Sequence, residues 1–210
     1  VEIRDVEIQT VYHEMLDDET GYIRISEFSE VTSDQYKKAF EDLEKRGMTK
    51  LVVDLRDNPG GLLDAVCGVL RQILPDGLIV YTEDKNGKRE EEKCDGKNEL
   101  NMPLSVLVNG NSASASEIFA GAVKDYGIGN IVGTTTYGKG VVQTIQPLND
   151  GSAVKITIAK YYTPKGNDIN KKGITPDVEA ALPEYSGDWT ELTHEEDTQL
   201  QAAREVLGQS

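Results

Sequence analysis

The sequence predicts an α/β fold in which a mixed β-sheet is flanked by helices and carries appended β-hairpins. Short apolar runs such as 51–55 and 104–108 are too short for helices and have the composition of strands buried in a parallel sheet. Each is followed by apolar residues at helical spacing, and repeated strand–helix–strand units are typical of α/β cores. Elsewhere, pairs of strand-like runs flank Asn-Gly or Asp-Gly turns, which predicts hairpins.

The N-terminal part is expected to contain two strands and a helix. The strand-like runs cover 6–16 and 21–28, with an acidic turn between them. A helix should begin at Thr32, with Gln35 as its capping-box partner, and end at Gly47.

The strand predicted at 51–55 is followed by a turn that contains proline and two glycines. Asn58-Pro59-Gly60-Gly61 follows the strand, and a helix over 62–73 should end before Pro75. Proline fixes such a turn, and the glycines let a ligand approach the backbone without a Cβ in the way. Taken alone, the segment would by default be interpreted as an ordinary strand–helix turn with nothing bound.

Two hairpins and a last helix complete the expected elements. The first hairpin covers 77–93, turns at Asn86-Gly87 and has a highly charged second arm, as expected of a protected edge strand. The second joins 141–148 to 152–162. Thr193 and Glu196 should cap a terminal amphipathic helix that runs to 207. We therefore expect a core over 1–182 and an acidic helical tail over 183–210, packed on that core.

Composition limits the possible functions. With 210 residues and 38% hydrophobic residues, the chain can form one sizeable core, and its net charge of −15 disfavours nucleic acid and anionic membranes as partners. We find no run long enough to span a membrane and no signal peptide. Cys67 and Cys94 form no metal-ligand pair, and Cys67 is expected to be a small buried side chain. No metal or cofactor is expected, and the redox compartment stays open.

The central stretch of the chain is a strand–turn–helix pattern that contains three serines. After the run 104–108 come Asn-Gly-Asn and then Ser112, Ser114 and Ser116, interleaved with alanines. A serine at such a turn would hold its hydroxyl above the sheet, beside backbone N–H groups at the positive end of a helix. Helix capping is the more common role of serine at this place, and the pattern alone does not choose among the three.

A second stretch supplies a candidate base. Lys139 lies between two glycines on a turn that leads into a strand, and Gln143 follows on that strand. The only histidines, His13 and His194, lie in no catalytic motif, which disfavours a Ser-His-Asp triad. A lysine must be neutral to accept a proton, so we expect Lys139 in an apolar pocket, with the uncharged Gln143 orienting its amine.

Together, these segments resemble the carboxy-terminal processing peptidases, also called tail-specific proteases. The motifs occur in order over nearly the whole chain, and they cover 54–62, 112–122, 137–143, 162–166 and 173–177. The resemblance implies a crotonase/ClpP-like core. It also implies a serine endopeptidase that needs no cofactor, has a Ser-Lys dyad and cleaves peptide bonds near protein C-termini.

The resemblance also assigns the site residues. It identifies Ser114 as the nucleophile, Lys139 as the general base, Gln143 as the support of the lysine, and the N–H groups of Gly61 and Ala115 as the oxyanion hole. Family members have been discussed with a further acidic residue, at Asp125 here. Eleven residues along a helix correspond to about 16 Å, so we expect Asp125 to be structural.

The resemblance further implies substrates with apolar C-termini and an extracytoplasmic location. Members of the family usually carry a PDZ domain, which we do not find here, and the start at Val1 suggests an excised piece of a longer protein. The oligomeric state stays open. A catalytically silent peptide-binding module is one alternative, although it should have lost Ser114 or Lys139. A crotonase-like acyl-CoA enzyme is less favoured, because it should have a basic surface for CoA.

Overall fold

A mixed β-sheet forms the centre of the molecule. The computed structural model describes residues 8–183 and 189–208. Within these ranges, six strands form the sheet in the order β1-β2-β3-β6-β7-β10, with β1 antiparallel to β2 and the other neighbours parallel. Their bounds are Val11–Met15 (β1), Thr20–Ile25 (β2), Lys50–Asp54 (β3), Leu104–Val108 (β6), Asn130–Gly133 (β7) and Val178–Glu179 (β10).

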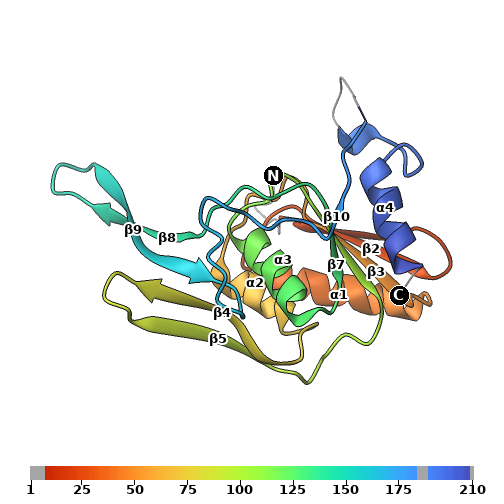
Figure 1. The fold of residues 1–210 in the computed structure, drawn as a ribbon, viewed down its shortest axis with the longest axis horizontal. Coiled ribbons are helices and arrows are strands. Elements are labelled where there is room, and N and C mark those ends of the chain that lie inside the picture. Colours follow the sequence, from red (N-terminus) through yellow and green to blue (C-terminus); the bar gives the residue numbers. More distant parts are fainter. Residues whose placement is uncertain (1–7, 184–188, 209–210) are drawn as a thin grey trace, which may run out of the picture.

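A second, antiparallel sheet lies beside the first. Among the described residues it has the order β5-β4-β9-β8. Its strands are Asp76–Asp84 (β4), Arg89–Asp95 (β5), Val141–Pro147 (β8) and Ala153–Tyr162 (β9). Figure 1 shows the β8–β9 hairpin extending away from the body of the protein. Both predicted hairpins are thus confirmed, and the charged arm β5 is an edge strand as expected.

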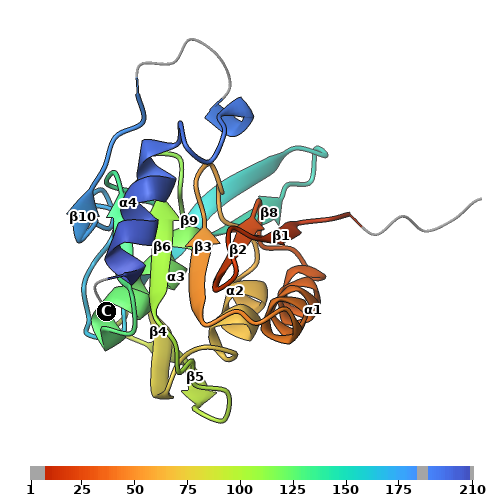
Figure 2. The same cartoon turned by 90° about the vertical axis from the view of Figure 1, so that its right-hand side faces the viewer.

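Helices cover both faces of the central sheet. Helices α1 (Thr32–Lys45), α2 (Leu63–Leu70) and α3 (Ala115–Tyr126) lie on one side, and α4 (Thr198–Leu207) lies on the other (Figures 1 and 2). A short 3-10 helix, η1 (Trp189–Glu191), precedes α4. This arrangement confirms the predicted α/β fold with its mixed sheet.

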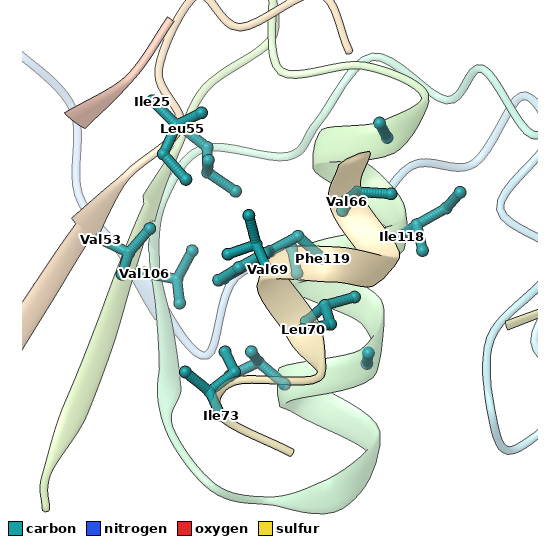
Figure 3. Close-up of a cluster of buried hydrophobic side chains, with 14 of the residues drawn as sticks. Ile25, Val53, Leu55, Val66, Val69, Leu70, Ile73, Val106, Ile118 and Phe119 are labelled. Atoms are coloured by element: carbon teal, nitrogen blue, oxygen red, sulfur yellow. The ribbon is translucent and has the colours of Figure 1, made fainter. Parts of the chain in front are cut away.

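The side chains of the parallel strands alternate between two hydrophobic clusters. Val53 and Val106 belong to the larger cluster with α2 and α3, and their neighbours Val52 and Leu107 belong to a smaller one with α4. Figure 3 shows the larger cluster, in which the side chains of the two strands lie opposite the helices; its labelled members are Ile25, Val53, Leu55, Val66, Val69, Leu70, Ile73, Val106, Ile118 and Phe119. Because both strand faces are buried, apolar residues such as Val52 and Val53 follow one another in the middle of the strands.

The first strand is shorter than expected. The strand-like run was expected from residue 6, but β1 begins at Val11, and positions 6 and 7 lie outside the described residues.

Helix α1 begins at Thr32, as predicted, but its N-terminal cap differs from the prediction. The predicted capping box is wrong: Thr32 is already helical, and its hydroxyl accepts the N–H of Ser29 at 2.8 Å. The Gln35 side chain instead accepts the N–H of Thr10 at 2.9 Å, because tertiary structure brings the chain before β1 to this helix.

The start of α4 differs from the prediction. Thr193 and Glu196 do form the expected side-chain bond, at 3.0 Å, but they close an isolated turn. The helix begins at Thr198, and its N-cap is Asp197, whose carboxylate accepts the N–H of Leu200 at 3.0 Å. The predicted boundary between core and tail stays a prediction, although α4 packs directly on the sheet.

Other expectations concern single side chains. Cys67 and Cys94 are both free and buried. His13 pairs with Asp42 and His194 with Glu14 at the surface, in agreement with a role outside catalysis. In the described ranges, no helix is both long and apolar enough to cross a membrane.

Candidate active site

Ser114 occupies a strained position between a strand and a helix. The turn after β6 ends at Ser114, which is the N-cap of α3 and has φ 55° and ψ −110°. A residue with a Cβ rarely adopts a positive φ, and residues held in such a conformation cluster at functional sites. The N-terminal N–H groups of α3 lie next to this serine, where they favour negative charge.

The structure distinguishes the three serines without reference to any family. The Ser112 hydroxyl donates to the carbonyl of Leu55 at 2.7 Å, and the Ser116 hydroxyl donates to the carbonyl of Asn58 at 3.0 Å. Both side chains are fully buried, whereas Ser114 is half-buried. Ser112 and Ser116 therefore attach the start of α3 to the loop after β3, and Ser114 is the one that a substrate can reach.

The loop after β3 packs directly against this serine. Gly60 has φ 103°, and an alanine there would place its Cβ 2.8 Å from the Cβ of Ser114 and 2.9 Å from the nitrogen of Ala115. Asn58 holds the loop, since its amide oxygen accepts the N–H of Gly60 at 2.9 Å and its amide nitrogen donates to the carbonyl of Ile25 at 2.8 Å. Glycine is thus required here by close approach to the serine.

Gly61 and Ala115 carry the two backbone N–H groups that are expected to form the oxyanion hole. Gly61 forms an isolated parallel bridge with Phe28, in which the flanking residues Gly60 and Leu62 make the hydrogen bonds. Within the described ranges, neither Gly61 nor Ala115 uses its own N–H in a hydrogen bond. Free N–H donors beside a reachable hydroxyl are what an oxyanion hole requires.

A buried glutamate, Glu117, joins the serine turn to the lysine turn. It is fully buried in the first turn of α3, and its Oε2 accepts the N–H of Ser114 at 2.9 Å and the N–H of Lys139 at 2.8 Å. Its Oε1 accepts the Thr136 hydroxyl and the N–H of Gly138, both at 2.6 Å. Sequence reasoning missed this residue, although its spacing three positions after Ser114 is that of a capping box.

The glycines around Lys139 are explained by a second loop. An alanine at position 140 would place its Cβ 2.4 Å from the nitrogen of Asn170, and one at position 138 would place it 3.1 Å from the nitrogen of Gly173. Lys139 itself is half-buried, and the apolar pocket expected around its amine stays a prediction. Among the described residues, no hydrogen bond joins its amine to the Ser114 hydroxyl.

Gln143 lies on the β8–β9 hairpin. Its side chain is exposed and donates to the Thr157 hydroxyl at 3.4 Å. The register of the two strands shifts between Val142 and Gln143, so a bulge separates this glutamine from the lysine turn. The structure therefore brings Ser114, Lys139, Gly61 and Ala115 to one place, with Gln143 on the adjacent hairpin.

Asp125 serves a different region. One carboxylate oxygen accepts the N–H of Lys165 at 2.8 Å, and the other accepts the Asn167 amide at 3.2 Å. These contacts fix the turn after β9, which agrees with the structural role expected for this residue. Across the described residues, no group of His, Cys, Asp and Glu side chains could hold a metal ion.

Most of the chain is similar to known proteins. The sequence profile of peptidase family S41 matches residues 19–180. The chain is 43% identical over 187 residues to the carboxyl-terminal-processing protease of Synechocystis sp. and 42% identical over 182 residues to the carboxy-terminal processing protease CtpA of Bacillus subtilis. These alignments cover 89% and 86% of this chain but only 43% and 39% of the relatives, so the chain spans less than half their length.

A solved structure shows the same arrangement of elements. The photosystem II D1 C-terminal processing protease superposes with a TM-score of 0.77 at 39% sequence identity. The match covers 86% of this chain and 51% of that protein.

Proposed function

Because this chain belongs to peptidase family S41, we propose that it is the catalytic part of a serine endopeptidase that hydrolyses peptide bonds near protein C-termini. The observation that carries the proposal is the double contact of Glu117, which holds the backbones of Ser114 and Lys139 on one carboxylate oxygen. A serine and a lysine fixed in this way form the dyad of the proposed mechanism.

The reaction is an acyl transfer to the serine followed by hydrolysis. The neutral amine of Lys139 takes the proton of Ser114, whose oxygen attacks the peptide carbonyl. The N–H groups of Gly61 and Ala115 stabilise the resulting oxyanion. The lysine then protonates the leaving amine, and a water molecule, activated by the same lysine, releases the acyl group from Ser114.

Because Lys139 is only half-buried, the substrate itself can help to exclude water from the site. A polypeptide bound across Ser114 would cover the exposed part of the lysine turn. In this complex Gln143 supports the amine from the neighbouring hairpin. Substrates are protein chains with apolar C-termini, and the protein acts outside the cytoplasm.

Cleavage of an unstructured protein with an apolar C-terminus tests the proposal. Ser114→Ala and Lys139→Ala should both abolish cleavage, and Gln143→Ala should reduce it. Lys172→Ala is the matched control, because it removes an exposed lysine from the neighbouring loop. A fluorophosphonate probe should label the wild type but not Ser114→Ala. Cleavage that survives in either Ser114→Ala or Lys139→Ala would overturn the dyad.

A further inference from the structure

Asp57 connects the two loops that form the candidate site. It follows β3 at a positive φ of 57°, directly before the Asn58–Gly61 turn. Its N–H donates to the side-chain oxygen of Asn109 at 3.0 Å, and its Oδ1 accepts the side-chain amides of Asn109 at 2.9 Å and Asn111 at 2.8 Å. One carboxylate thus ties the glycine loop to the turn that presents Ser114.

The other oxygen of Asp57 receives a bond from the C-terminal segment. The indole N–H of Trp189 donates to Asp57 Oδ2, and the indole ring lies over the guanidinium of Arg56, with its centre 4.0 Å from the central carbon. Arg24 lies 5.1 Å from the same ring. A cation over an indole face is attracted by the ring electrons, so the position of Trp189 is fixed both by its edge and by its face.

Arg56 extends this connection to α4. Its side chain is 1% exposed, and its guanidinium contacts Asp54 Oδ2 at 2.6 Å and Asp197 Oδ2 at 2.8 Å. Asp197 is the N-cap of α4, so the segment that contains Trp189 is held at both of its ends. The residues that receive this segment, Asp54 to Asp57, lead straight into the glycine loop.

We infer that Trp189 is a positioning residue, which aligns the oxyanion loop with the nucleophile turn through its hydrogen bond to Asp57. The inference rests on the proposed function. Without the indole N–H, Asp57 keeps its contacts to Asn109 and Asn111 but loses the partner that fixes its second oxygen. The separation of Gly61 and Ser114 would then vary, and small displacements of catalytic groups cost large factors in rate.

Amide hydrogen exchange tests the alignment independently of catalysis. Trp189→Phe keeps a ring over Arg56 but removes the N–H donor, and it should raise exchange in residues 57–62 and 109–116. Arg204→Gln is the matched control, because it breaks a contact of α4 to Asp17, at 2.9 Å, on another side of the molecule. Unchanged exchange in Trp189→Phe, or an equal rise in Arg204→Gln, would overturn the inference.

Fluorescence gives a second measurement of the docked state. Trp189 is the single tryptophan of the chain, so the tryptophan emission comes from this side chain alone. Asp57→Asn should shift the emission to longer wavelength and make it more easily quenched by acrylamide. Emission and quenching identical to those of the wild type would contradict the contact.

Kinetics separate this inference from the proposed function. Trp189→Phe should lower kcat roughly 10- to 100-fold with little change in KM, while Arg204→Gln retains wild-type kcat. An unchanged kcat in Trp189→Phe would show that Trp189 does not contribute to catalysis, and it would not contradict the proposed peptidase activity. A wild type that neither cleaves the substrate nor reacts with the fluorophosphonate would contradict the proposed peptidase activity. Hydrogen exchange would still decide whether Trp189 orders the two loops.

Discussion

Ser114 and Lys139, which are far apart in the sequence, donate their backbone N–H groups to the same oxygen of Glu117. Since these bonds measure 2.9 and 2.8 Å, the two amide nitrogens can be no more than about 5.7 Å apart. Glu117 also accepts bonds from Thr136 and Gly138, so the whole lysine turn is fixed to the first turn of α3. The relative position of the two proposed catalytic residues thus depends on one buried carboxylate.

Glu117→Gln should therefore impair both activity and stability. The carboxylate accepts four hydrogen bonds, whereas a glutamine would turn an NH₂ group toward two of the donors. We expect kcat to fall by about 100-fold. Each buried donor left unpaired should lower the free energy of unfolding by about 1–3 kcal/mol, as measured by urea denaturation. Glu41→Gln, at an exposed position of α1, is the control, and wild-type values in Glu117→Gln would contradict this role.

Gly60→Ala tests the close approach of the glycine loop to the nucleophile. Its Cβ would lie 2.7 Å from the carbonyl oxygen of Ala113 and 2.8 Å from the Cβ of Ser114, so the loop has to move and activity should be lost. Gly87→Ala is the matched control, because Gly87 also has a positive φ, of 80°, but has nothing within 4 Å of the added methyl. We expect Gly87→Ala to cost about 1–2 kcal/mol of unfolding free energy and to retain activity. Equal activity in the two variants would show that Gly60 tolerates a side chain.

Much of the fold could be predicted because its signals are local. Apolar runs, helical spacing and Asn-Gly or Asp-Gly turns depend only on neighbouring residues, and they predicted both hairpins and the strands other than the two-residue β10. The placement of α4 opposite the other helices could not be predicted. Val52 and Val53 are both apolar, so the sequence does not show which face of the strand receives which helix.

The site was less predictable, since its contacts join distant segments. The choice of Ser114 over Ser112 and Ser116 depends on which hydroxyls meet the carbonyls of Leu55 and Asn58, which no local pattern reveals. The spacing of Glu117 predicts a bond to Ser114 but not its bonds to the lysine turn. The capping role predicted for Gln35 was wrong for the same reason, because its side-chain oxygen accepts the N–H of Thr10, which is distant in the sequence.

Asp17 should make the stability of the protein sensitive to acid. Partial burial raises the pKa of its carboxyl, but bonds from the N–H groups of Glu19 and Thr20 and from Arg204 outweigh burial and lower the pKa from 3.8 to about 2. A lowered pKa means that the folded state favours the ionised form, so this stabilisation is present above pH 3.8 and is lost as the pH falls toward about 2.

The comparison of Asp17→Asn with the wild type measures this contribution. Asp17→Asn should have a lower free energy of unfolding near neutral pH, and its difference from the wild type should shrink as the pH falls toward about 2. Asp18→Asn makes the same change of net charge at the next position and should not reproduce this pH dependence. A difference that is independent of pH would show that the ionised form of Asp17 is not favoured by folding.

Arg56→Lys tests the buried connection between β3 and α4. The guanidinium contacts Asp54 and Asp197 at the same time and also donates to Gln199 at 3.2 Å, which a single ammonium group cannot reproduce. The ammonium keeps the positive charge but leaves at least one buried acceptor without its donor, so we expect the free energy of unfolding to fall by about 1–3 kcal/mol in urea denaturation. Arg89→Lys is the control, since its pair with Glu83 lies at the surface and should contribute little to the free energy of unfolding. A cost for Arg56→Lys no larger than that for Arg89→Lys would show that the connection does not stabilise the fold.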